Sequence, residues 1–265
     1  MKGAVVRDPV RAVFGVVSTV VLVIVVLPLV VTVFTAFNAG TVTAFPPEGW
    51  SLRWFRNVVE QPELMAGLRL SVLLALASSV VSITLGTAAA FALSRMEFRG
   101  REVIDSVLMS PLIVPQVIVG LSFLIFFVKL DAGSPFFRLL LLHWLLTIPY
   151  AMRVVRAGLA RVSPRLEEAA VGLGASRLRS FMQVTLPQIR SGLFVAVFFC
   201  FVVSFDNFTA TAFLAADGAT LPVALYQYID SRLDPTVSAI AARMMLGTTA
   251  FVLVADRTVG IHRIT

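Results

Sequence analysis

The sequence has few charged residues, and it has few of the residues that hold small soluble or metal-binding domains together. Of its 265 residues, 14% are charged and 58% are apolar, whereas an ordinary soluble domain has about 25% charged residues. The one cysteine, Cys200, excludes an internal disulfide. The two histidines, His143 and His262, lie far apart in the sequence, which argues against a structural metal site. A mean hydropathy of +0.92 therefore predicts a chain that lies mostly in lipid.

Long apolar runs predict an all-α, polytopic membrane protein with about six spanning helices. A bilayer core takes about 20 apolar residues per helix, and such runs lie at about 12–36, 66–93, 103–128, 137–156, 189–215 and 236–255. The first run follows a basic start, as in a signal peptide, but it exceeds the usual apolar length of about 7–15 residues. We therefore expect an uncleaved first helix and a single transmembrane domain over residues 1–265.

The basic residues predict the orientation of the chain. With the amino terminus in the cytoplasm, fifteen of the 22 Lys and Arg residues fall on the inner side and seven on the outer side. Both termini and the segment 157–188 are then cytoplasmic. The net charge of +7 is accordingly interpreted as a topology signal, with membrane lipid and not nucleic acid as the partner.

Two features inside the predicted spans concern packing and bending. Pro111 and Pro115 in the third span and Pro149 in the fourth each remove a backbone donor and bend a helix. The second span has small residues at every fourth position, a pattern that lets another helix approach closely: Ser78, Ser82, Gly86 and Ala90. These features fit a packed bundle of kinked helices, and they equally fit a pathway that opens and closes.

The cytoplasmic segment 157–188 carries the signs of two short helices. Ser163 and Pro164 favour a helix start, and Gly174 favours its end. Ser176 can cap a second helix, which Leu186-Pro187 would end before the fifth span begins. Such a segment suits a docking element for another protein. An amphipathic connector on the lipid headgroups is the alternative, which Arg177, Arg179 and Arg190 favour.

A spaced motif in this segment resembles the EAA loop of binding-protein-dependent ABC importer permeases of the type I fold. It consists of Glu168, Ala169, Ala170, Gly174, Val184, Leu186 and Pro187, with Val184 where the family usually has isoleucine. The resemblance implies that this segment docks in a groove of a separate ATPase subunit. Glu168 would then make the polar contact, Ala169 and Ala170 would allow close approach, and Gly174 would form the turn.

The same resemblance implies the partners. A cytoplasmic ATPase dimer would bind ATP and Mg, a second permease subunit (related or identical) would complete the pathway, and a solute-binding protein would dock outside. The chain itself has no phosphate-binding Gly-x-x-x-x-Gly-Lys-Ser/Thr motif, so we expect no enzyme activity and no cofactor bound by this chain. The implied location is the bacterial inner membrane.

Further stretches resemble spermidine/putrescine-type permeases, which makes polyamines the leading solutes for import by alternating access. They are the segments 49–55, 110–120, 204–208, 221–226 and 234–239. Asn207 stands where that subfamily commonly has a second acid. The same pattern occurs in permeases for other small solutes, so an amino-acid derivative, a metal ion or a phosphonate is the alternative.

Asp206 is the most informative ionisable residue, because an acid inside a span is a functional candidate. It could contact a cationic solute, together with Ser204 and Asn207, or it could pair with Arg243 of the sixth span.

Trp50 and Trp54 are expected to anchor the chain at the outer interface, or to contact a cation or the docked binding protein. An ion-coupled secondary transporter would be expected to show internal repeats, which we do not find, and His143 lacks an evident partner for an intramembrane enzyme.

Overall fold

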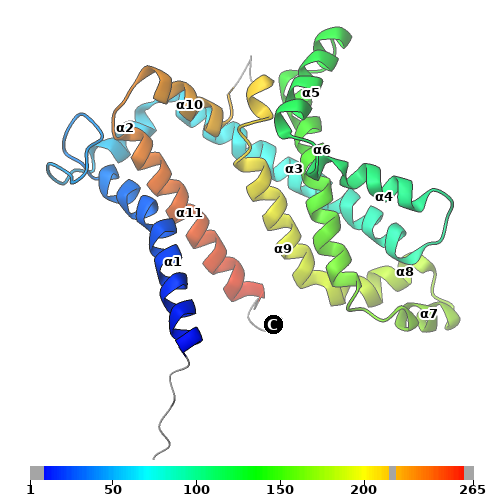
Figure 1. Cartoon of the computed structure of the whole chain (residues 1–265). Helices are drawn as coiled ribbons and strands as arrows, with labels where there is room; N and C mark the ends of the chain where they lie inside the picture. Colours follow the sequence, from blue (N-terminus) through cyan, green and yellow to red (C-terminus); the bar gives the residue numbers. More distant parts are fainter. Residues whose placement is uncertain (1–8, 215–218, 260–265) are drawn as a thin grey trace, which may run out of the picture. The chain divides into compact units, whose positions relative to one another are not determined.

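The computed structural model describes residues 9–214 and 219–259, and the prediction of an all-α chain is confirmed (Figure 1). The helices are α1 (Pro9–Ala36), α2 (Arg53–Glu60), α3 (Pro62–Arg95), α4 (Arg101–Met109), η1 (Ser110–Leu112), α5 (Gln116–Leu130), α6 (Pro135–Leu159), α7 (Pro164–Gly172), α8 (Arg177–Ser180), η2 (Phe181–Thr185), α9 (Leu186–Phe205), η3 (Thr211–Phe213), α10 (Leu221–Ser231) and α11 (Thr236–Val259). Here η1 and η3 are 3₁₀ turns and η2 is a π turn.

The number of spans is close to the predicted six. Four of the described helices are long and apolar enough to cross a membrane, and a fifth candidate is the bent pair α4–α5. The predicted sixth span coincides with α11. The chain forms two compact units, a terminal unit (Met1–Gln61 and Tyr228–Leu253) and a central unit (Pro62–Gln227 and Val254–Thr265).

The central unit is built on α3, α6 and α9, which pack along one another. The stripe of small residues on α3 is buried, as the spacing predicts. At Gly86 an added Cβ would lie 2.7 Å from the Cβ of Ala151 on α6, so only glycine permits this approach. Beside it, the hydroxyls of Ser82 and Thr147 lie 2.6 Å apart, which satisfies both groups inside the bundle.

The predicted third span is broken into two helices. α4 and α5 meet at an angle of 101°, and η1 with the two prolines separates them. The prolines therefore bend the chain as predicted, although far more sharply than a kink within one straight span. Asp105 on α4 accepts two hydrogen bonds from one Arg156 nitrogen on α6, at 2.7 and 2.8 Å, and thereby attaches α4 to α6.

Two predicted boundaries around the fifth span are wrong. The second cytoplasmic helix does not end at Leu186-Pro187, because α8 continues through the π turn η2 into α9. In that turn the Leu186 N–H donates to the carbonyl of Phe181, five residues earlier, and the wider turn accommodates Pro187, which lacks an N–H.

The C-terminal end of this span also differs from the prediction, since α9 ends at Phe205 and not near residue 215. There Asn207 Oδ1 accepts the backbone N–H of Thr211 at 3.3 Å, so a side chain replaces the helical carbonyl.

In the terminal unit, polar contacts join α1 and α2 to α11. Thr35 donates to Ser238 over 3.1 Å, and Asn57 donates to Thr236 over 2.8 Å. Arg243 donates to the carbonyl of Phe55 at 2.6 Å. By contrast, the apolar side chains of α1 are almost all exposed, as expected of a helix surrounded by lipid or by another subunit.

Candidate functional site

The segment 157–188, called the coupling segment below, folds into the predicted short helices at one end of α6 and α9 (Figure 1). Ser163 occupies the N-cap position of α7, and Pro164 lies in its first turn. Gly174 has a φ of +93°, a left-handed conformation that side chains with a Cβ rarely adopt, so it forms the predicted turn. Ser176 caps α8 by accepting the N–H of Arg179 at 3.2 Å.

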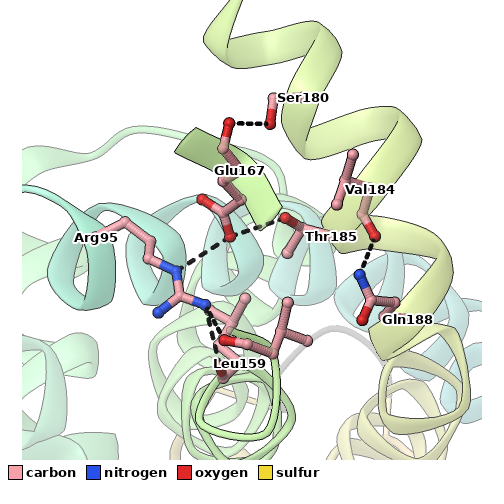
Figure 2. Close-up of polar contacts among 8 residues, drawn as sticks. Arg95, Leu159, Glu167, Ser180, Val184, Thr185 and Gln188 are labelled. Carbon is pink, nitrogen blue, oxygen red and sulfur yellow. Dashed lines mark hydrogen bonds and ion pairs between the residues drawn. The ribbon is translucent and has the colours of Figure 1, made fainter. Parts of the chain in front are cut away.

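Glu167 attaches this segment to the membrane helices, a role that the sequence did not reveal. Figure 2 shows its carboxylate between Arg95 of α3 and Thr185 of η2, with Oε1 at 3.1 Å from Arg95 Nε and 2.8 Å from Thr185 Oγ1. Arg95 also donates to the carbonyls of Leu159 and Val162, at 3.2 and 2.7 Å. Both charged side chains are only 14% exposed. The Arg95–Glu167 ion pair therefore joins four segments, namely α3, the end of α6, α7 and η2.

Glu168, the residue of the motif, is exposed. Ala169 beside it is exposed and Ala170 is half-buried. Apolar side chains that face solvent surround them, namely Leu166, Val171, Leu173 and Leu178. An acid among small and apolar side chains is a surface that suits another protein better than water. Within the motif's last part, Leu186 is half-buried and Pro187 is exposed.

A groove of about 1190 Å³ lies between the C-terminal part of α3 and the coupling segment. Arg95 and Glu167 line it together with mostly apolar side chains from α3, α7 and η2. The open space means that the coupling segment is not packed against α3 along its whole length, so the Arg95–Glu167 pair is an important link between them.

The predicted pathway residues of the central unit separate into two kinds. Ser204 and Asn207 are buried, whereas Asp206 between them is exposed at the end of α9. Within the described part of the central unit, the Asp206 carboxylate makes no hydrogen bond or ion pair. The adjacent residue Asn207 donates to Gln116 of α5 at 3.0 Å. The structure therefore leaves Asp206 available to a ligand, while its neighbours serve packing.

His143 does have partners, contrary to the expectation from the sequence. Its Nδ1 lies 2.7 Å from Ser204 Oγ, and its Nε2 lies 3.1 Å from Thr211 Oγ1. Two sequence signals pointed to polar groups in this region. One is His143 with Thr147 one turn away in an apolar span, and the other is Gln116 directly after a proline. Such signals mark polar positions but do not say which of them meet.

Trp50 and Trp54 lie in the terminal unit. Trp50 is exposed, and it forms an isolated backbone bridge with Asn38. The Trp54 indole N–H donates to the carbonyl of Asn38 at 2.8 Å, and the guanidinium of Arg53 lies 4.3 Å from its ring centroid. These contacts hold Trp54 at the start of α2. A role in solute contact stays a prediction for both tryptophans, as does the pairing of Asp206 with Arg243.

Comparisons with known proteins agree with the helical fold. The chain is 32% identical to the putrescine transport system permease protein PotI of Escherichia coli (strain K12), over 94% of this chain and 89% of that protein. It is 23% identical to the spermidine/putrescine transport system permease protein PotC of the same strain, over 86% of each. A crystal structure of a bacterial ABC transporter involved in the import of the acidic polysaccharide alginate has the same fold, with a TM-score of 0.73, 15% identity, and coverage of 98% of this chain and 97% of that chain.

The family match includes the whole coupling segment and the residues that follow the end of α9 at Phe205. Residues 82–259 match the family described as binding-protein-dependent transport system inner membrane component. The chain belongs to this family of transporter permeases.

Proposed function

We propose that the chain is the permease subunit of an ATP-driven importer for polyamines, of which putrescine is the first to test. The observation that carries the substrate class is the similarity to a putrescine permease over 94% of this chain. Family membership and several apolar helices make it a multi-pass protein of the inner membrane. In the proposed topology both termini are cytoplasmic, which places the coupling segment on the side where ATP is available.

The exposed surface around Glu168 is the proposed contact with the ATPase. Two ATPase subunits would bind ATP and Mg, and their closure on ATP would push on α7. Because η2 joins the coupling segment to α9 without a break, movement of α7 and α8 is passed to a membrane helix. The chain, with a second permease subunit of related or identical sequence, thereby opens its pathway alternately to each side without covalent chemistry of its own.

Asp206 is the proposed contact for the cationic solute inside this pathway. The Asp206 carboxylate is exposed at the end of a membrane helix and makes no hydrogen bond or ion pair within the described part of its unit, so it is free to bind a cation. Polyamines carry separated ammonium groups and would supply that charge. A solute-binding protein on the outer face would deliver them, since the family is named for such proteins.

The experiment is uptake of labelled putrescine by the full transporter in proteoliposomes, comparing wild type with Asp206→Asn. We expect uptake to fall at least tenfold with Asp206→Asn, because one charge-assisted contact is worth more than about 1.4 kcal/mol. Asp131→Asn is the matched control: it makes the same change at an exposed acid after α5, and uptake should stay unchanged. Unchanged uptake in Asp206→Asn would refute the proposed contact, and wild-type uptake of another solute class alone would refute the polyamine assignment.

A double variant separates solute contact from the alternative pairing with Arg243. If the acid only neutralises that arginine, Asp206→Asn combined with Arg243→Gln should restore uptake, because no unpaired charge is left. If Asp206 contacts the solute, the double variant should transport no better than Asp206→Asn alone.

A further inference from the structure

A chain of buried polar side chains surrounds the end of α9. It links His143 of α6, Ser204 of α9, Asn207 after it, Thr211 of η3 and Gln116 of α5. His143 and Thr211 are almost inaccessible to solvent, and Ser204 and Asn207 are buried as well. Buried polar groups are retained only where hydrogen bonds satisfy them, so this arrangement fixes the positions of all of its members.

The side-chain hydrogen bonds of this polar chain all point in one direction, from Ser204 through His143, Thr211 and Asn207 to Gln116. Asn207 Oδ1 accepts both the N–H and the hydroxyl proton of Thr211, at 3.3 and 3.0 Å, so the Asn207 amide nitrogen must donate to Gln116 Oε1. Since the Thr211 proton is used in this way, Thr211 Oγ1 accepts from His143 Nε2. The other ring nitrogen then accepts from Ser204. A neutral histidine ring, with its proton on Nε2, is consistent with all of these hydrogen bonds.

Close backbone packing supports the same region from the side of α5. A Cβ at Gly120 would lie 2.6 Å from the carbonyl oxygen of Ala210 and 2.8 Å from the ring of Phe213. α5 can therefore lie against the segment that follows α9 only because residue 120 is glycine. The polar chain and this contact hold the same short segment, residues 207–213, against α5 and α6.

We propose that His143 is a positioning residue for Asp206: through Ser204 and Thr211 it fixes the break of α9 and so aims the acid into the solute pathway. This inference rests on the proposed function of Asp206. The physical reason is that Asp206 follows Ser204 by two residues and precedes Thr211 by five, so both ends of its segment bond to one imidazole ring. Without that ring, α9 could continue beyond Phe205 or fray, and the carboxylate would turn away.

The first test measures accessibility and needs no knowledge of the solute. In a Cys200→Ala background, which removes the only native thiol, Asp206→Cys and Ala210→Cys are labelled with a charged methanethiosulfonate in the assembled transporter. Position 206 is exposed and position 210 is fully buried, so 206 should react fast and 210 slowly. Adding Thr211→Val or His143→Leu should speed labelling at 210 about tenfold, the effect of losing one buried hydrogen bond.

The second test is putrescine uptake by the same single variants without engineered cysteines. Thr211→Val and His143→Leu should lower uptake, and His143→Gln, whose amide can both accept and donate, should recover part of it. Thr19→Val is the matched control, because it removes a hydroxyl that only bonds to its own helix α1. If the His143→Leu protein fails to insert into the membrane, Thr211→Val still tests the inference, because it removes a hydroxyl of the same polar chain.

The outcomes are distinct from those of the proposed function. Slow labelling at 210 in every variant, or slow labelling at 206 in the starting protein, would overturn the inference. Faster labelling at 210 with full putrescine uptake would also overturn it, since the network would then serve packing alone. If the wild-type transporter imports another solute and no polyamine, the substrate assignment fails, and the same variants then test the positioning role through uptake of that solute.

Discussion

Substitution by glutamine should have different effects at two neighbouring acids of the coupling segment, Glu167 and Glu168. Glu167 is half-buried and bonded to Arg95 and Thr185, whereas Glu168 is exposed on the face proposed for the ATPase. Glu167→Gln should therefore loosen α7 from α3. Glu168→Gln should leave α7 in place and weaken the contact with the ATPase.

The size of the first effect follows from the contacts. Glutamine can still accept the hydroxyl of Thr185, but it removes the negative charge from an arginine that is 14% exposed. A hydrogen bond to a charged group contributes about 1.5–3 kcal/mol, and weak solvent screening favours a value of about 2 kcal/mol here. Because about 1.4 kcal/mol is a factor of ten, the α7 amides should lose roughly 30-fold in hydrogen-exchange protection.

Hydrogen exchange of the purified transporter, followed by mass spectrometry, measures this loss peptide by peptide. Glu168→Gln is the matched control, with unchanged protection of α7 and reduced ATP-dependent transport. The double variant Arg95→Met with Glu167→Gln should recover part of the lost protection, since removing both charges leaves none buried and unpaired. Equal protection of α7 in the two single variants would refute the assigned role of Glu167.

Four further substitutions test other contacts. Gly174→Asp should abolish transport while the protein stays inserted, because the turn needs a positive φ, and membrane fractionation with an uptake assay checks it. Glu168→Lys should also abolish transport with normal insertion, and loss of ATPase co-purification would show the reason. Gly86→Val should lower the melting temperature in detergent through overpacking of about 1–3 kcal/mol or more, as a fluorescence melt would record. Asp105→Asn should increase hydrogen exchange in α4, whose contact with Arg156 it weakens.

Much of the coupling segment could be predicted because its signals are local. An N-cap serine, a proline in the first turn and a glycine at the end act within a few residues, so Ser163, Pro164 and Gly174 were placed correctly. The π turn before Pro187 could not be predicted. It depends on how α8 and α9 are held by the rest of the central unit, and such turns lack a sequence pattern of their own.

The length of α9 was overestimated for a related reason. Hydropathy counts apolar residues and predicts where lipid begins and ends, but it does not detect that Asn207 takes over a backbone hydrogen bond. That capture is stable only because Gln116 and Thr211, from other elements, satisfy the rest of the amide. A polar network between distant segments is a tertiary property, so His143 could be noticed in the sequence but its partners could not.

The two candidate sites share one physical principle. In each, two adjacent polar residues have different tasks, one at least half-buried and bonded to other elements and the other exposed: Glu167 and Glu168 in the coupling segment, Asn207 and Asp206 after α9. Neighbouring residues on a helix or turn point about 100° apart, so one can hold the segment while the next faces a partner. In the proposed function, the anchoring residue fixes where its neighbour points, and a contact made by the exposed residue would be passed to the membrane helices. A substitution at an anchor should therefore impair the same step as one at its neighbour, but through lost protection of the segment and not through lost binding.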